Sequence, residues 1–301
     1  MRNVNYKNIK KREVNKMTLE QYMRELWLMD KQYGREEELY PLINMLLRDG
    51  ANTEKLSIRD VNKGQSAKNV ESRKYIDGFG SFPDLAIFDE SFPEKENIDS
   101  NLQKIYGCVE AKCISQELIE CLDLNTIEII CKENKKNKKN NENEEISWIN
   151  YYVKKNKTLL NGSGGRAKDA GQLLGELLWY GKVLYTNGVI WKYYTLSKES
   201  GNKINGIRKD YISNPPSKGE VGYKTWIFEQ CKETPLKIKS KNIGDLTKIY
   251  NKIKDKSSPC CKPRPMYLNS KRNFIIFFPL HFIFQLTYFQ DIITRRQICI
   301  F

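Results

Sequence analysis

Three residues, Asp84, Glu110 and Lys112, have the types and the spacing that bind a divalent cation next to a phosphate. Asp84 directly precedes the apolar run 85–88, which is typical of a buried strand. Glu110 follows a second stretch, 104–109, whose small and apolar residues are typical of a central strand, and Lys112 comes two residues later. Because side chains alternate along a strand, Glu110 and Lys112 are predicted to point to the same face of a sheet.

If the two strands pair as a hairpin, Asp84 and Glu110 meet at one end of the sheet, with the carbonyl of Ala111 between them. Oxygen donors of this kind suit Mg²⁺ or Mn²⁺. Such an ion polarises a phosphate and lowers the pKa of a bound water. Lys112 would position that water, help to deprotonate it, or offset charge on the phosphate. The alternative is structural: Asp84 in a turn, and Glu110 and Lys112 as a cross-strand ion pair.

In this order and setting, Pro83-Asp84 and Glu110-Ala111-Lys112 resemble the signature of the PD-(D/E)xK nuclease superfamily. The resemblance implies an α/β fold in which a restriction-endonuclease-like mixed β-sheet lies between helices, with the metal site at one sheet end. It also implies Mg²⁺-dependent hydrolysis of DNA phosphodiester bonds, with Mn²⁺ as the other candidate ion.

The resemblance extends to both sides of this signature and covers about residues 31–200. Residues 35–47 look like the family's first helix, which lends an acidic residue to the metal site. Gln172 opens an apolar helical run, and Asn187-Gly188 lies between two β-rich runs. These two features are similar to the Gln-bearing helix and the hairpin in nuclease regions of Type I restriction subunits and relatives. The likeness places Gln172 near the DNA backbone or the lysine, and Asn-Gly favours a type I′ turn.

The acidic residue of the first helix is ambiguous, because Glu36, Glu37 and Glu38 are consecutive. At 100° per residue they point in three directions. We expect Glu37 to serve the metal site, with Glu36 as the next choice. The structural alternative is that all three favour the helix N-terminus through its dipole.

The positive charge of the chain lies outside the predicted core. The net charge is +14, yet residues 31–200 carry 25 Lys/Arg against 26 Asp/Glu, whereas residues 201–256 carry 13 against 6. Lysines bind phosphates without regard to sequence. The basic region therefore predicts contact with DNA or RNA, the alternative being a solvated lysine-rich surface. The candidate lysines are Lys237, Lys239, Lys241, Lys248, Lys252 and Lys254.

These patterns divide the chain into a basic segment with a packing helix (1–30), the nuclease-like core (31–200), a basic region (201–258) and a hydrophobic tail (259–301). A wholly polar insert at about 132–145 is predicted to be disordered. Before it, residues 114–131 are apolar at helix-like intervals, and the stretch 92–101 is expected to be flexible.

The eight cysteines are scattered without a CxxC pair, which opposes a zinc site or a disulfide framework and favours reduced thiols in a cytoplasm. His281 is the single histidine and lies outside the core, so Ser-His-Asp and Cys-His mechanisms are disfavoured. The apolar run 274–289 is shorter than the roughly 20 residues that span a bilayer. A membrane anchor is therefore a less favoured reading than a buried segment, a partner-binding patch or a frameshift product.

The resemblance implies a restriction role, in which relatives work with a motor or methyltransferase subunit. Neither a Walker loop nor a methyltransferase glycine motif is visible in this sequence. Two other classes stay open: a non-catalytic nucleic-acid-binding module, and an interaction subunit that docks through the tail. The target sequence, DNA versus RNA, and the oligomeric state are not determined by these patterns.

Overall fold

The computed structural model describes residues 17–50, 56–61, 70–76, 82–95, 97–119, 127–133, 149–153, 165–214 and 235–256. Residues 1–16, positions 134–145 of the predicted insert and residues 257–301, which include the hydrophobic tail, lie outside the described residues. The helices are α1 (Leu19–Gln32), the 3₁₀ turn η2 (Glu36–Glu38), α2 (Leu39–Gly50), α3 (Val70–Ile76), α4 (Ile98–Gln103), α6 (Gly165–Tyr180), α7 (Lys198–Ser213) and α9 (Thr247–Lys256). The strands are β1 (Leu56–Asp60), β2 (Leu85–Asp89), β3 (Ile105–Ala111), β4 (Ile127–Glu133), β5 (Ile149–Val153), β6 (Lys182–Thr186), β7 (Ile190–Leu196), β8 (Pro235–Leu236) and β9 (Ile238–Asp245).

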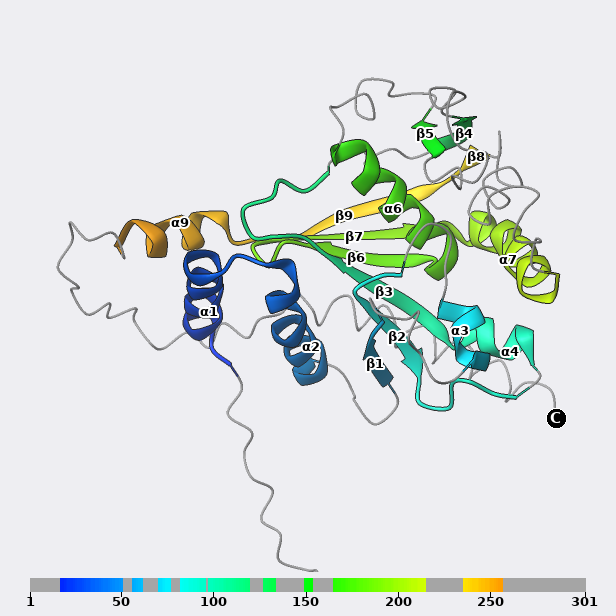
Figure 1. Ribbon diagram of the computed structural model, residues 1–301, viewed down its shortest axis with the longest axis horizontal. Helices are drawn as coiled ribbons and strands as arrows, with labels where there is room; N and C mark the ends of the chain where they lie inside the picture. The colour runs from blue at the N-terminus through cyan, green and yellow to red at the C-terminus, as the bar shows by residue number, and fades with distance from the viewer. Residues whose placement is uncertain are drawn as a thin grey trace, which may run out of the picture.

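A six-stranded mixed sheet organises the chain, in the order β1-β2-β3-β6-β7-β9 (Figure 1). Only β3 and β6 are parallel neighbours, and the other four pairs are antiparallel. The expected α/β class with a mixed sheet is confirmed. A second, three-stranded sheet has the order β5-β4-β8. The region 201–256, assigned from its charge as a basic region, supplies the edge strand β9 of the main sheet.

The main sheet has one hydrophobic cluster on each face, as period-two alternation requires. Along β2, Ala86 and Phe88 belong to one cluster, and Leu85 and Ile87 to the other. The first cluster packs against α6, α7 and α3, and the second against α1, α2 and α9. The sheet therefore lies between two layers of helices, and the face covered by α6 carries the side chains discussed below.

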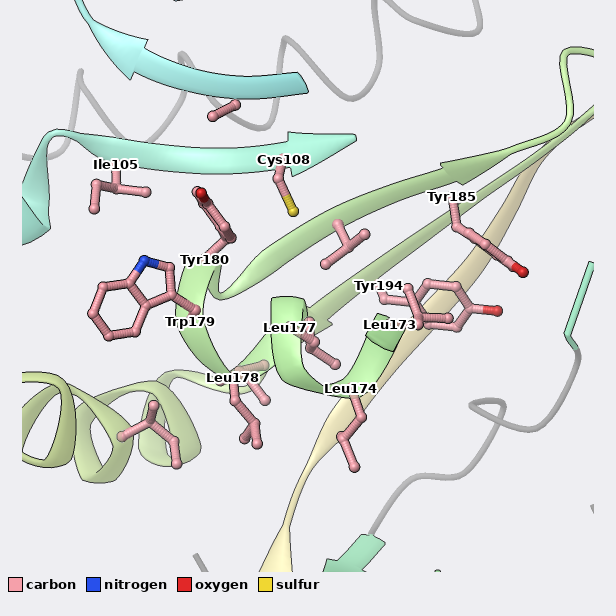
Figure 2. Packing of buried hydrophobic residues seen from close by; sticks show 14 of the residues in the cluster. Ile105, Cys108, Leu173, Leu174, Leu177, Leu178, Trp179, Tyr180, Tyr185 and Tyr194 are labelled. Carbon is pink, nitrogen blue, oxygen red and sulfur yellow. The ribbon is translucent and has the colours of Figure 1, made fainter. Parts of the chain in front are cut away.

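Helix α6 covers its face of the sheet with leucines, tyrosine and tryptophan. Leu173, Leu174, Leu177 and Leu178 are buried, and Figure 2 shows them on α6, in the same cluster as Cys108 of β3 and the labelled aromatic rings. Trp179 donates a hydrogen bond of 2.6 Å to the Tyr75 carbonyl of α3. This packing fixes α6 against the strands whose ends carry the acidic residues. The helix expected from about residue 166 to 178 is confirmed.

The β6–β7 hairpin packs against α1 and α2. Its turn is centred one residue later than the expected Asn187-Gly188, because the Asn187 amide donates to the Ile190 carbonyl at 3.3 Å. Gly188, with φ of +83°, therefore occupies the first central position, where type II′ turns carry glycine. The Tyr22 hydroxyl of α1 and the Trp191 indole both donate to the Gly188 carbonyl.

Three local expectations are corrected. The predicted insert begins too early, because Lys132 and Glu133 end strand β4. The interval 114–131 has no described helix: residues 114–119 form turns and irregular chain, and 127–131 belong to β4. The stretch 92–101 contains the start of α4, where buried Asn101 bonds both the amide and the carbonyl of Glu94 at 2.6 Å. Those hydrogen bonds order a segment whose composition alone suggested flexibility.

Candidate active site

Asp84 and Glu110 lie opposite each other at one end of the sheet. Strands β2 and β3 are antiparallel, and their register pairs Leu85 with Val109, which brings the preceding and following residues, Asp84 and Glu110, face to face. Asp84 Oδ2 also accepts a hydrogen bond of 2.7 Å from the amide of Ala111. The expected pairing of these strands is confirmed. The contact with Ala111 is made by its amide, while the carbonyl was the group expected to face a cation.

Lys112 contacts two glutamates from different parts of the chain. Its Nζ donates to Glu110 Oε1 and lies 3.9 Å from Glu36 Oε2. Glu36 is held from its other side by the Tyr40 hydroxyl, which donates to Oε1 at 3.2 Å. The 3₁₀ turn η2 therefore delivers a carboxylate to the sheet end.

Glu37, the preferred glutamate of the sequence interpretation, is directed elsewhere. Its carboxylate pairs with exposed Arg35 at 3.5 Å, and its side chain is 53% exposed. Adjacent residues of a tight helical turn project in different directions. The glutamate at the site is thus Glu36, which had been the second choice.

Glu176 of α6 joins the cluster, although it was not among the residues singled out in the sequence. Glu176 is 1% exposed, and its carboxyl interacts with that of Glu110. Gln172, one turn earlier on α6, hydrogen-bonds to Glu176. Gln172 therefore reaches the cluster through Glu176. A signal for this was present: Glu176 is the one charged residue in an otherwise apolar helical run that begins at Gln172.

The burial of these carboxyls opposes their ionisation. Burial, followed by the charge of Glu110, raises the pKa of Asp84 to about 8. Burial raises the pKa of Glu176 to about 8. Burial and the charge of Glu176 raise the pKa of Glu110 well above its ordinary value. For Lys112, burial lowers the pKa, but the charges of Glu110 and Glu36 outweigh it and the pKa is raised. Lys112 is therefore a permanent cation in this arrangement.

The cluster has more acidic groups than positive ones. Asp84, Glu110 and Glu176 are all at least 94% buried, and Lys112 pairs with Glu110. Glu110 Oε2 is buried and receives no hydrogen bond. Carboxylate oxygens in this setting fit a hard divalent cation in donor type and in charge. As the side chains are placed, no three His, Cys, Asp or Glu residues in the described ranges converge closely enough to enclose an ion.

The six candidate lysines lie on the surface and apart from this cluster. Lys237, Lys239 and Lys241 are on or beside the edge strand β9, and the others are on α9. Lys237 is 3.6 Å from Glu199 of α7, and Lys254 is 3.5 Å from Asp30 of α1. All six lysines are exposed to solvent, and the ion pairs of Lys237 and Lys254 are made with α7 and α1.

Comparison of the chain with protein-family models, with curated proteins and with solved structures finds no match. Within the described ranges, no helix combines the length and the apolarity needed to cross a bilayer.

Proposed function

We propose that this chain is a metal-dependent nuclease of the PD-(D/E)xK superfamily that hydrolyses DNA phosphodiester bonds. The observation that carries the proposal is the facing pair Asp84 and Glu110 on adjacent strand ends, with Lys112 against Glu110. The mixed sheet between two helical layers supports a restriction-endonuclease-like fold. The sequence resemblance supports the same fold independently of these contacts.

In this proposal Asp84 and Glu110 hold a Mg²⁺ or Mn²⁺ ion, with the Ala111 carbonyl and Glu36 as further oxygen donors. The ion supplies Lewis-acid activation of the phosphate and of a bound water. Glu36 takes the place first given to Glu37, because its carboxylate is the one that approaches Lys112. Water molecules would complete the shell, as is usual for Mg²⁺.

Lys112 acts as a fixed positive charge. The charges of Glu110 and Glu36 raise its pKa, so it does not give up its proton at neutral pH. Of the three roles open to it from sequence, deprotonating the water is therefore disfavoured. Lys112 orients the water or the phosphate and offsets negative charge in the transition state.

The lysines of β9 and α9 would hold the nucleic acid by its phosphates. Lys239, Lys241, Lys248 and Lys252 are exposed on β9 and α9. Contacts of this type add affinity without sequence preference. Gln172, expected near the DNA backbone or Lys112, interacts instead with Glu176.

A non-catalytic nucleic-acid-binding module is the second candidate. It is favoured by the ion pair of Lys112 with Glu110, which is complete without a cation. An intact ion pair can stabilise a fold without catalysis. The two candidates differ in one respect: cleavage requires a divalent cation, whereas phosphate binding by surface lysines does not.

The resemblance suggests a role in a restriction or defence system, with DNA as substrate and a motor or methyltransferase subunit as a partner. Membrane attachment forms no part of the proposal. Purified protein incubated with DNA or RNA in Mg²⁺, Mn²⁺ or EDTA tests it. DNA cleavage that EDTA abolishes is expected. Binding without cleavage under every condition would favour the non-catalytic module, and cleavage of RNA alone would change the substrate.

A further inference from the structure

Glu176 is the feature of the cluster for which the proposed nuclease chemistry gives no role. It comes from α6, across from the strands that carry Asp84 and Glu110, and its side chain is 1% exposed. An acidic side chain is rarely this buried without a specific partner. Its partners are Glu110 and Gln172. Glu176 of α6 therefore interacts both with Gln172 on its own helix and with Glu110 at the end of β3.

Glu110 has one oxygen held and one oxygen free of donors. Its Oε1 accepts from Lys112, and its Oε2 is buried without a donor. A carboxylate held through one oxygen by a long lysine side chain retains rotational freedom about its terminal bond. The interaction of Glu176 with the Glu110 carboxyl limits that freedom. Gln172 in turn orients Glu176, one helical turn away on the same face of α6.

We propose that Glu176 is a positioning residue that fixes the carboxylate of Glu110 for cation binding, with Gln172 fixing Glu176. The inference rests on the proposed function, because it concerns how the cation site of that function is prepared. It gives Gln172 a role through hydrogen bonding to Glu176, in place of direct contact with DNA or Lys112. Groups that orient a metal ligand commonly change affinity by roughly 10- to 100-fold when removed.

Two substitutions separate positioning from the other roles of a buried glutamate. Glu176→Gln keeps the shape, donates an amide hydrogen to Glu110 and accepts from Gln172. Glu176→Met keeps similar bulk but loses the polar interactions with Glu110 and Gln172. Glu90→Gln, in the exposed turn after β2, is the matched control for removing one carboxylate elsewhere.

The measurement is Mn²⁺ binding to the full chain by calorimetry, with folding of each variant checked by circular dichroism. We expect the wild type, Glu90→Gln and Glu176→Gln to bind with similar affinity, and Glu176→Met to bind about tenfold more weakly. Wild-type affinity in Glu176→Met would overturn the inference. So would equal weakening in Glu176→Gln and Glu176→Met, since it would mean that the charge of Glu176 is needed directly.

Failure of the proposed function has a different signature. Wild-type protein that binds no Mn²⁺ would remove the cation site itself, whatever the variants do. If Glu176→Met does not fold, Gln172→Leu replaces it, since Gln172 is only partly buried. A weaker Mn²⁺ affinity in Gln172→Leu is expected, and an unchanged affinity would overturn the inference.

Discussion

Lys112 Nζ lies 3.9 Å from Glu36 Oε2, which joins the end of β3 to the short turn before α2. Glu37, its neighbour, points to Arg35 at the surface. This difference gives a matched pair of substitutions. We predict that Glu36→Gln lowers the rate of DNA cleavage by about tenfold, while Glu37→Gln leaves it unchanged. Steady-state cleavage at several Mg²⁺ concentrations measures both. A larger loss of cleavage rate in Glu37→Gln would show that Glu37, the residue expected from sequence, serves the metal site.

The buried ion pair of Lys112 with Glu110 is expected to contribute to the free energy of unfolding. Lys112→Met leaves a buried carboxyl without its cation, at a cost of about 3 kcal/mol in the free energy of unfolding near pH 8. The cost is smaller at acidic pH, because burial raises the pKa of Glu110 and favours its uncharged form. The double substitution Lys112→Met with Glu110→Gln removes the unpaired charge and recovers most of the loss. Urea unfolding of the single and double variants measures this coupling, and additive losses would contradict it.

Asp84 should make the metal-free protein less stable as the pH rises. Its pKa is about 8 in the folded state, because of burial and the charge of Glu110, and lies near 3.8 when unfolded. The folded state therefore keeps a proton that the unfolded state releases, so the contribution of Asp84 is complete below about pH 4 and is lost as the pH approaches 8.

Asp84→Asn tests this, since the amide oxygen still accepts from Ala111. In EDTA, the wild type should lose at least ~1 kcal/mol more than Asp84→Asn between pH 5 and pH 8, a difference of a few degrees in Tm. Thermal unfolding at several pH values gives both curves. Parallel curves for the two proteins would show that Asp84 ionises normally in the folded chain.

Gly188 is expected to be intolerant of a side chain. Its φ is +83°, and an added Cβ would lie 2.8 Å from a methyl carbon of Leu26. Strain and overpacking together predict that Gly188→Ala destabilises the protein by about 2 kcal/mol or more. Gly206→Ala is the control, because nothing lies within 4 Å of its added Cβ in helix α7. That control should gain about 0.5–1 kcal/mol. Urea unfolding compares them, and equal effects would contradict the close packing of the hairpin on α1.

The basic surface predicts a salt-dependent contribution to DNA affinity. Replacing Lys239 and Lys241 by Gln should weaken binding at low salt and reduce the slope of log affinity against log salt by about 2. The same change should leave Mn²⁺ affinity unaltered, since both lysines are exposed on the edge strand β9. Fluorescence anisotropy with a labelled duplex measures the slope. An unchanged slope would move the DNA surface away from β9.

The sequence was sufficient for features that depend on local pattern. The buried strands after Asp84 and before Glu110, helix α6 and the β6–β7 hairpin follow from apolar periodicity and turn residues. The choice of Glu36 over Glu37 did not follow, because it depends on the rotation of a 3₁₀ turn relative to β3. The partnership of Glu176 with Glu110 is a tertiary contact between a helix and a strand. Periodicity marks Glu176 as unusual but does not identify its partner.

Single-turnover cleavage of supercoiled plasmid by purified wild-type protein and by Asp84→Asn, each with Mg²⁺ and with EDTA, tests the central claim most directly. Glu90→Gln serves as the control for loss of one carboxylate. We expect the wild type and Glu90→Gln to cleave the plasmid in Mg²⁺. We expect no cleavage by Asp84→Asn, and no cleavage by any of the proteins in EDTA. Cleavage by Asp84→Asn at the wild-type rate, or by the wild type in EDTA, would contradict it.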